Sequence, residues 1–302
     1  MTGAASTMDG ILNIDKPRGM TSFAVVAAVR RLSSERRVGH SGTLDPEATG
    51  VLPVFCGRAT RVIEFLADTT KTYRAGIELG VATDSYDAAG RVVARGDASR
   101  VRREDLAAAL EPFRGLIEQT PPMYSAVKHQ GQPLYRLARA GITVERRRRK
   151  VEVSRLELID WRPPLVTLEI DCSKGTYIRA LANDLGEALG CGAMLSSLVR
   201  LRCGPFALED AAPFDGLALA FEEDRWQALL RSADSVLGHW PAVQIGEELA
   251  AAVRNGQLVD IGEPAGEATG GYRRAYAADG SLLAVLRFEP EVGLWHPDKV
   301  FR

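Results

Sequence analysis

Apolar and polar residues alternate along several short segments, a pattern typical of strands with one buried face. Residues 71–79 show the alternation most clearly. The apolar face of this segment consists of Tyr73, Ala75, Ile77 and Leu79. Residues 10–17 predict a short strand that Pro17 ends, and residues 165–170 predict another. These segments indicate a sheet that is covered on at least one side.

Other segments repeat apolar residues with the period of an α-helix. Residues 175–190 are the clearest case, and a glycine follows the end of the repeat. The repeat consists of Tyr177, Leu181, Leu185 and Leu189. Residues 23–32 predict a helix capped by Thr21 or Ser22, with three valines on its apolar side. Shorter helices are expected over residues 59–67 and 102–110.

Strands and helices mix without a regular βαβ order, which favours an α+β fold with a mixed, mainly antiparallel sheet flanked by helices. Near the C-terminus, Asp279-Gly280 lies between two apolar segments and predicts a hairpin. We expect a large first domain over residues 1–235 and a small β-rich domain over residues 241–302. The acidic residues 221–234 are interpreted as a linker.

The composition is typical of a globular protein with a large hydrophobic core. The chain has 302 residues, of which 46% are hydrophobic, so it can bury a large core. Its first ten residues lack the pattern of a signal peptide, and no apolar run reaches the roughly 18 residues that a membrane span needs. We therefore expect a cytoplasmic protein without membrane association. The four cysteines and four histidines lack metal-ligand spacing, so no metal is expected.

Charge is distributed unevenly, although the net charge is only −1. Residues 1–160 carry 25 Lys and Arg against 19 Asp and Glu, whereas residues 161–302 carry 13 against 20. This asymmetry indicates that the N-terminal part contacts a polyanion. Residues 120–150 are rich in proline, glycine and cations, and we interpret them as an insertion that lies over the body of the protein.

The cations of this insertion are candidates for nucleic-acid contact. They are Lys128, Arg136, Arg146, Arg147, Arg148, Arg149 and Lys150. Tyr124 and Tyr135 interleave with such cations, which suits base stacking combined with phosphate contact. The alternative interpretation is a packed helical excursion whose charged face is only solvated.

One segment, GHSGTLDPEATG at residues 39–50, is too rich in glycine for a regular helix or strand. An isolated Asp-Pro pair such as Asp45-Pro46 usually only forms a turn. Here Gly39, Gly42 and Gly50 surround the aspartate and permit close backbone approach. The loop thus carries one carboxylate on a bent backbone, and the Asp-Pro pair taken alone is most simply a turn.

The chain resembles the TruB family, the bacterial tRNA pseudouridine-55 synthases, in five blocks that occur in order over residues 10–203. The blocks are GILNIDKPRGMTS (10–22), GHSGTLDPEATGVLP (39–53), KTYRAGIELGVATDSYDAAG (71–90), PPMYSAVKHQGQPLYRLAR (121–139) and CSKGTYIRALANDLGEALGCGA (172–193). The resemblance implies isomerisation of uridine-55 in the T-loop of tRNA. Uracil is detached from C1′ of its ribose and rejoined through C5, with no cofactor or metal.

By this resemblance, Asp45 is the nucleophile, which acts on C1′ of the sugar or on C6 of the base. The resemblance also pairs Arg179 with Asp45. A bidentate guanidinium would orient the carboxylate and keep it ionised by lowering its pKa. Taken without the resemblance, an arginine on a helix more often forms a surface ion pair.

Four further residues are implied to bind the target uridine. His40 helps to hold the flipped-out nucleotide, and Tyr73 stacks on its base. Tyr177 and Leu198 line the uridine pocket. The alternative for each of these side chains is an ordinary place in the core.

The resemblance also implies the pseudouridine synthase fold, with the insertion as a basic lid and residues 241–302 as a PUA-like RNA-binding β-barrel. The partner is then the T-arm of tRNA, and we expect a monomer without an obligatory protein partner. Two alternative functions stay open. One is an RNA-binding tRNA folding chaperone in which catalysis is secondary, and the other is catalysis inside a guide-RNA complex.

Overall fold

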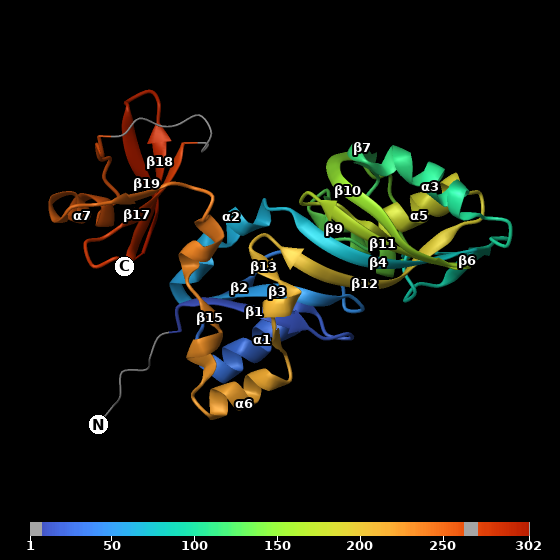
Figure 1. The fold of residues 1–302 in the computed structure, drawn as a ribbon, viewed down its shortest axis with the longest axis horizontal. Helices are drawn as coiled ribbons and strands as arrows, with labels where there is room; N and C mark the ends of the chain where they lie inside the picture. Colours follow the sequence, from blue (N-terminus) through green and yellow to red (C-terminus); the bar gives the residue numbers. More distant parts are fainter. Residues whose placement is uncertain (1–7, 263–270, 302) are drawn as a thin grey trace.

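The computed structural model describes residues 8–262 and 271–301. Residues 1–7, on which the expected absence of a signal peptide partly rests, lie outside the described residues. A long main sheet carries helices at both of its ends, and a smaller sheet stands apart at one end of the molecule (Figure 1). No helix in the described ranges is long and apolar enough to cross a membrane.

The main sheet has eleven strands, and its principal order is β14-β1-β3-β12-β4-β11-β10-β7. The strands are β1 (Gly10–Lys16), β2 (Val38–His40), β3 (Thr49–Cys56), β4 (Lys71–Leu79), β7 (Gly115–Gln119), β10 (Arg149–Arg162), β11 (Leu165–Cys172), β12 (Ala193–Cys203), β13 (Phe206–Ala207), β14 (Ala212–Pro213) and β15 (Leu230–Arg231). Only β1 with β14 and β3 with β12 pair in parallel. The expected mixed, mainly antiparallel sheet of an α+β fold is therefore confirmed.

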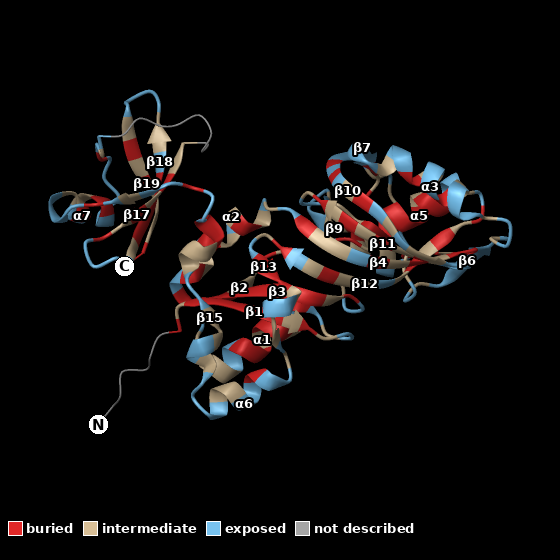
Figure 2. Ribbon diagram, in the orientation of Figure 1, coloured by how far each residue is buried: buried red, intermediate tan, exposed pale blue. Residues whose placement is uncertain are grey.

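Two short ribbons extend from the main sheet. One pairs β5 (Val81–Thr83) with β6 (Val92–Arg95), and the other pairs β8 (Lys128–His129) with β9 (Gln132–Pro133) inside the insertion. The insertion also contains the short helix α4 (Leu134–Arg139). In Figure 2 the outer end of the first ribbon is exposed, whereas β1 and β3 are largely buried.

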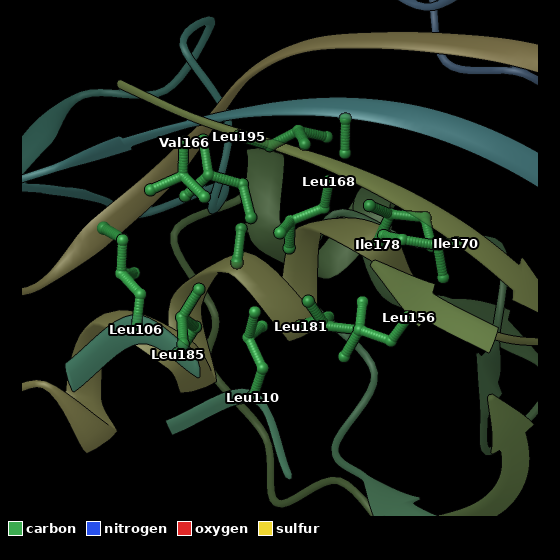
Figure 3. Close-up of a cluster of buried hydrophobic side chains, with 14 of the residues drawn as sticks. Leu106, Leu110, Leu156, Val166, Leu168, Ile170, Ile178, Leu181, Leu185 and Leu195 are labelled. Carbon is green, nitrogen blue, oxygen red and sulfur yellow. The ribbon is translucent and has the colours of Figure 1, made fainter. Parts of the chain in front are cut away.

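One core cluster lies between the sheet and the helices α3 (Arg103–Leu110) and α5 (Ile178–Ala188). Its side chains converge from both helices and from β11 (Figure 3). They include Leu106, Leu110, Leu181, Leu185, Val166, Leu168 and Ile170. On β4, Ala75, Ile77 and Leu79 are buried, as the alternation predicts, while Tyr73 is only partly buried.

The helix α5 begins later than the apolar repeat predicts. Tyr177 has an extended backbone, with φ −101° and ψ 106°, and stands immediately before the first helical residue. Gly190 has φ +72° shortly after the helical end, in the left-handed region that favours glycine. The helix thus exists as predicted, but Tyr177 precedes its first turn and does not belong to its apolar face.

A second group of helices covers the other end of the sheet. The helix α1 (Ser22–Ser33) is capped by Thr21, whose hydroxyl accepts a hydrogen bond from the Ala24 N–H at 3.0 Å. Its valines are buried with side chains of β1, β3 and α6 (Gly216–Glu222). The helix expected over residues 59–67 is divided into the 3-10 helix η1 (Gly57–Val62) and α2 (Ile63–Ala67).

The interpretation of residues 221–234 as a linker is wrong. This stretch pairs with the main sheet through β15, where Arg231 lies opposite Ile11 of β1. Trp226 stacks on Phe221 with ring centroids 5.7 Å apart. Glu222, Glu223 and Asp224 are exposed, while the apolar side chains pack against the core formed by α1, β1 and β3. The remaining 3-10 helices are η2 (Glu111–Phe113), η3 (Leu208–Asp210), η4 (Trp226–Leu229) and η5 (Ala233–Leu237).

The C-terminal part forms a four-stranded sheet of its own with one helix. Its elements are β16 (Ala242–Gln244), α7 (Glu247–Arg254), β17 (Tyr272–Tyr276), β18 (Leu282–Glu289) and β19 (Leu294–Val300). The antiparallel pair β17 and β18 is the hairpin predicted around Asp279-Gly280. Residues 263–270 and 302 lie outside the described residues, and among those described β16 and β19 do not pair. A closed barrel therefore stays a prediction.

Candidate active site

The glycine-rich loop lies between β2 and β3 and is held by the start of α1. The Ser22 hydroxyl accepts a hydrogen bond from the Leu44 N–H at 2.9 Å and donates one to the Leu44 carbonyl at 3.1 Å. Both Ser22 and Leu44 are buried. The residue that follows, Asp45, is thereby placed by a backbone whose polar groups are already satisfied.

Lys16, at the end of β1, holds the loop through a hydrogen bond to the Pro46 carbonyl. Its fully buried ammonium donates hydrogen bonds to the carbonyls of Pro17 (2.9 Å), Met20 (2.7 Å) and Pro46 (3.2 Å). Burial lowers the pKa of Lys16 to about 8, although the nearby Asp45 carboxylate opposes this shift. Sequence reasoning assigned Lys16 no role, because a lysine before proline carries no local sign of three carbonyl partners.

Asp45 and Arg179 meet although 134 positions separate them. The Nε atom of Arg179 lies 3.0 Å from Oδ2 of Asp45, and Nη2 donates to Oδ1 at 3.3 Å. The contact is thus two-pronged, which fixes the carboxylate plane as well as its charge. The Arg179 side chain is only 7% exposed, whereas that of Asp45 is 43% exposed. The carboxylate therefore faces open space while its partner does not.

Arg179 has a second carboxylate partner that sequence reasoning missed. Its Nη1 atom lies 3.3 Å from Oδ2 of Asp87 and donates to the carbonyl of Ser85 at 3.3 Å. Its Nη2 atom also donates to the Tyr124 carbonyl at 2.8 Å. Asp87 lies in the block at residues 71–90, but nothing in its local sequence distinguishes it from a turn former.

The pKa of Asp45 departs from the simple expectation. Burial raises this pKa above its usual range, the Arg179 guanidinium lowers it, and the Asp87 carboxylate raises it again. As expected, the charge of Arg179 taken by itself lowers the pKa of Asp45. The net direction is upward, because desolvation is the larger effect.

A cavity of about 280 Å³ opens at Asp45, close to the lower end of the roughly 300 Å³ or more usual for ligand pockets. Its lining residues are Arg18, Asp45, Glu47, Ala48, Asp87, Ala88, Ala89, Arg179, Leu195, Ser196, Ser197 and Leu198. Leu198, predicted to line the uridine pocket, is among them. Within the described parts of the chain, no group of three or more His, Cys, Asp and Glu side chains could hold a metal ion.

Tyr73 and His40 do not line this cavity but lie beside Arg200. Tyr73 on β4 is opposite Arg200 on β12. Burial raises the pKa of Tyr73, and the adjacent Arg200 opposes the rise. Burial and the same guanidinium lower the pKa of His40. Tyr177 stands at the start of α5, two positions before Arg179.

Arg200 is a further residue that sequence reasoning missed. It is 1% exposed, and its Nε–H donates to the Val51 carbonyl at 2.7 Å. A side chain at Gly42 would begin 3.0 Å from its Nη1 atom. The guanidinium therefore lies directly under the loop that carries Asp45, and only tertiary structure brings it there.

The seven cations proposed for RNA contact are not among the residues that line the cavity, and they lie on the insertion and the start of β10. Six of them are exposed, and Arg146 is half-buried. Arg146 donates to the Pro121 carbonyl at 3.0 Å, and Arg148 lies 4.0 Å from Glu118. The insertion is joined to the cavity lining at its root, where Tyr124 contacts Arg179.

Comparison with known families gives two matches. The model described as TruB family pseudouridylate synthase (N terminal domain) matches residues 30–178. The model described as tRNA pseudouridylate synthase B C-terminal domain matches residues 179–237. Together they span the loop of Asp45, the insertion and the helix of Arg179.

Individual proteins are similar over most of the chain. A protein of Dehalococcoides mccartyi (strain ATCC BAA-2100) named tRNA pseudouridine synthase B is 48% identical over 297 residues, covering 97% of both chains. Proteins of the same name from Symbiobacterium thermophilum and Pseudomonas aeruginosa are 51% and 47% identical over 256 residues, covering 84% of this chain and 84% of each relative.

Solved structures share the fold. A chain in an H/ACA RNP bound to a substrate RNA containing 2′-deoxyuridine matches with a TM-score of 0.72 and 26% identity, covering 97% of this chain and 85% of that chain. A chain in a Cbf5-Nop10-Gar1 complex matches with a TM-score of 0.69 and 29% identity, covering 92% and 78%. The main sheet and its helices therefore have the architecture found in those assemblies.

Proposed function

This chain belongs to the TruB family of pseudouridylate synthases, and from that premise we propose that it isomerises uridine-55 in the T-loop of tRNA to pseudouridine. The reaction breaks the bond between N1 and C1′ and forms one between C5 and C1′. The proton lost from C5 is balanced by one gained at N1. Oxidation states do not change.

The observation that carries this proposal is the two-pronged contact between Asp45 and Arg179 at the edge of a cavity. A carboxylate can bond to, or stabilise, an electron-poor sugar carbon while the base leaves, or it can add to C6 of the base. Arg179 keeps the carboxylate oriented. Asp87 holds the opposite side of the guanidinium, so its direction is set by two anions.

Binding of the target nucleotide is assigned to the surrounding side chains. A uridine must leave its stack to reach Asp45, which requires a site that holds the extruded base. Leu198 supplies an apolar wall of the cavity. Tyr73 offers an aromatic face, and His40 at the end of β2 and Tyr177 just before α5 would contribute to the same binding.

The T-arm of tRNA is the proposed partner. The exposed cations of the insertion give a surface suited to phosphate contact, and the insertion would act as a lid whose root lies on Arg179. Residues 241–302 would form a PUA-like domain that binds another part of the RNA. We further propose that the chain acts in the cytoplasm as a monomer without an obligatory protein partner.

The alternative of a folding chaperone is not favoured, because the similar proteins named above are all synthases. Catalysis inside a guide-RNA complex predicts dependence on partner proteins. Purified chain that converts tRNA by itself would support the proposal of a self-sufficient enzyme over that alternative.

Release of tritium from uracil C5 tests the reaction directly, because the label leaves when C5 bonds to C1′. Purified protein is incubated with T-arm RNA labelled at this carbon. Wild type should release the label at uridine-55, and Asp45→Asn should release none during many wild-type half-lives. Unchanged release by the Asn variant would overturn the assignment of the nucleophile, and no release by wild type would overturn the function.

A further inference from the structure

Gln119 is a buried polar residue to which the proposed mechanism gives no part. It ends β7, immediately before the insertion, and is 3% exposed. Its Oε1 atom accepts a hydrogen bond from the Tyr177 N–H at 3.0 Å. Its Nε2 atom donates to the Tyr177 carbonyl at 3.3 Å. One amide thus holds both backbone polar groups of a single residue 58 positions away.

Tyr177 is the residue on which the start of α5 depends. The helix receives no side-chain cap at this end, and the Tyr177 carbonyl accepts the Leu181 N–H at 3.1 Å. The Tyr177 N–H precedes the helix, so it needs a partner from elsewhere in the molecule. Gln119 supplies that partner, and the direction in which the helix starts is fixed from β7.

We propose that Gln119 is a positioning residue for Arg179, which lies two positions after Tyr177. This inference rests on the proposed function. Arg179 projects from the first turn of α5, so a small rotation at Tyr177 would move its guanidinium relative to Asp45. The 3.0 Å contact between Nε and Oδ2 tolerates little displacement, and misplacement by about 1 Å can cost roughly 100-fold in rate.

A second contact from the same segment reinforces the first. The Tyr124 carbonyl accepts from Nη2 of Arg179 at 2.8 Å, five positions after Gln119. Residues 119–124 therefore contact the start of α5 twice, at Tyr177 and at Arg179. This segment is also the root of the insertion, so the part proposed to bind RNA and the arginine that orients Asp45 share one support.

The experiment compares Gln119→Met with wild type, because methionine has similar length but no amide. We expect kcat to fall roughly 10- to 100-fold with KM for tRNA changed less than about threefold. The acidic limb of the pH–rate profile should move to higher pH. A poorly placed Arg179 opposes the raised pKa of Asp45 less, so the carboxylate ionises only at higher pH.

Two further variants separate positioning from general destabilisation. Gln227→Met changes an exposed glutamine of η4, which lies outside the cavity lining and the insertion, and should leave kcat and the pH profile unchanged. Gln119→Glu keeps an acceptor for the Tyr177 N–H but loses the donor to its carbonyl. It also places a buried carboxylate oxygen against the Tyr177 carbonyl, so it should lower both kcat and Tm at least as far as Gln119→Met does.

A double-variant comparison decides whether Gln119 acts through Arg179. In an Arg179→Ala background, Gln119→Met should lower the single-turnover rate by less than about twofold. An equal loss in both backgrounds, or a folded Gln119→Met with wild-type kcat and pH profile, overturns the inference. Wild-type label release that Asp45→Asn abolishes would keep the proposed function intact even then.

Discussion

Asp45 shares the Arg179 guanidinium with Asp87, so two carboxylates compete for one buried cation. Partial loss of hydration is the main reason that the pKa of the Asp45 carboxylate is raised. Lys16 contributes a further positive charge nearby, but its hydrogens are used by three carbonyls. Burial and the Asp87 carboxylate thus oppose ionisation of Asp45, whereas Arg179 and Lys16 favour it.

The free-energy cost of burying the Asp45 charge predicts that Asp45→Asn stabilises the protein at neutral pH. The folded pKa of Asp45 lies above its unfolded value of 3.8, so stability falls as pH rises through the interval between them. Removing the charge abolishes that loss. We expect a higher Tm for Asp45→Asn than for wild type at pH 7.

The same comparison at lower pH provides its control. The difference in Tm should shrink as pH falls toward 3.8, because Asp45 of the wild type then becomes neutral as well. A lower Tm for Asp45→Asn at pH 7 would show that the ion pair with Arg179 outweighs the burial. Thermal unfolding of both proteins across this pH range is the measurement.

At the scale of elements, the site lies where the two ends of the main sheet join through the short parallel pairing of β3 and β12. The glycine-rich loop enters β3 at Thr49 and Gly50, which lie opposite Val199 and Arg200. Gly50 has φ +97°, a conformation that other residues rarely adopt. The joint between the strands therefore sets the position of the loop that carries Asp45.

Gly50→Ala should disrupt this joint. A Cβ atom there would begin 2.3 Å from the carbonyl oxygen of Arg200 and 2.9 Å from its nitrogen, so backbone would have to move. We expect the free energy of unfolding to fall by more than about 2 kcal/mol, because the overlap adds to the strain of the positive φ, with loss of activity. Urea unfolding and label release measure the two effects.

Gly19→Ala is the matched control, because Gly19 has φ +81° but a Cβ atom added there would meet no other atom within 4 Å. It introduces backbone strain without overlap. Its loss of stability should be smaller, at about 1–2 kcal/mol, than that of Gly50→Ala. Equal losses for the two variants would contradict the role given to the close approach between β3 and β12.

At the scale of the whole molecule, an aromatic cluster joins the C-terminal sheet to the main body. Trp240 stacks on Tyr272 with ring centroids 4.5 Å apart and meets Phe65 edge-on at 4.9 Å. Lys299 lies 2.9 Å from Glu64 on α2. In Figure 1 the C-terminal sheet accordingly stands beside α2, at the opposite end of the molecule from β6.

Trp240→Ala should uncouple the two parts. Trp240 is 9% exposed, and removal of a buried aromatic side chain costs about 3–5 kcal/mol. We expect the C-terminal sheet to unfold in a separate, earlier transition by calorimetry. If this sheet binds tRNA, conversion of full tRNA should fall more than conversion of an isolated T-arm.

Trp226→Ala provides the comparison, because Trp226 stacks on Phe221 of α6 and not at the junction. This variant should lower the Tm without splitting the transition. A single transition for Trp240→Ala, with equal losses on both RNA substrates, would contradict the coupling through the aromatic cluster.

Neighbouring residues were enough to predict the local elements and to locate the segments of the candidate site. Alternation along β4 follows from whether each side chain prefers water or the interior. The start of α1 follows from a capping hydroxyl, and the hairpin of β17 and β18 follows from the turn preference of Asp279-Gly280. These preferences are properties of neighbouring residues, so they can be read along the chain. The five family blocks likewise located the loop of Asp45 and the helix of Arg179.

Tertiary structure alone decided which distant groups meet. The partners of Arg179 include Asp87 and the Tyr124 carbonyl, and the start of its helix depends on Gln119. Residues 221–234, expected to be a linker, belong to the main body because they pair with β1 through β15. Hydrogen bonds and ion pairs need atoms within about 3 Å, and local apolar patterns do not specify which remote segment supplies them.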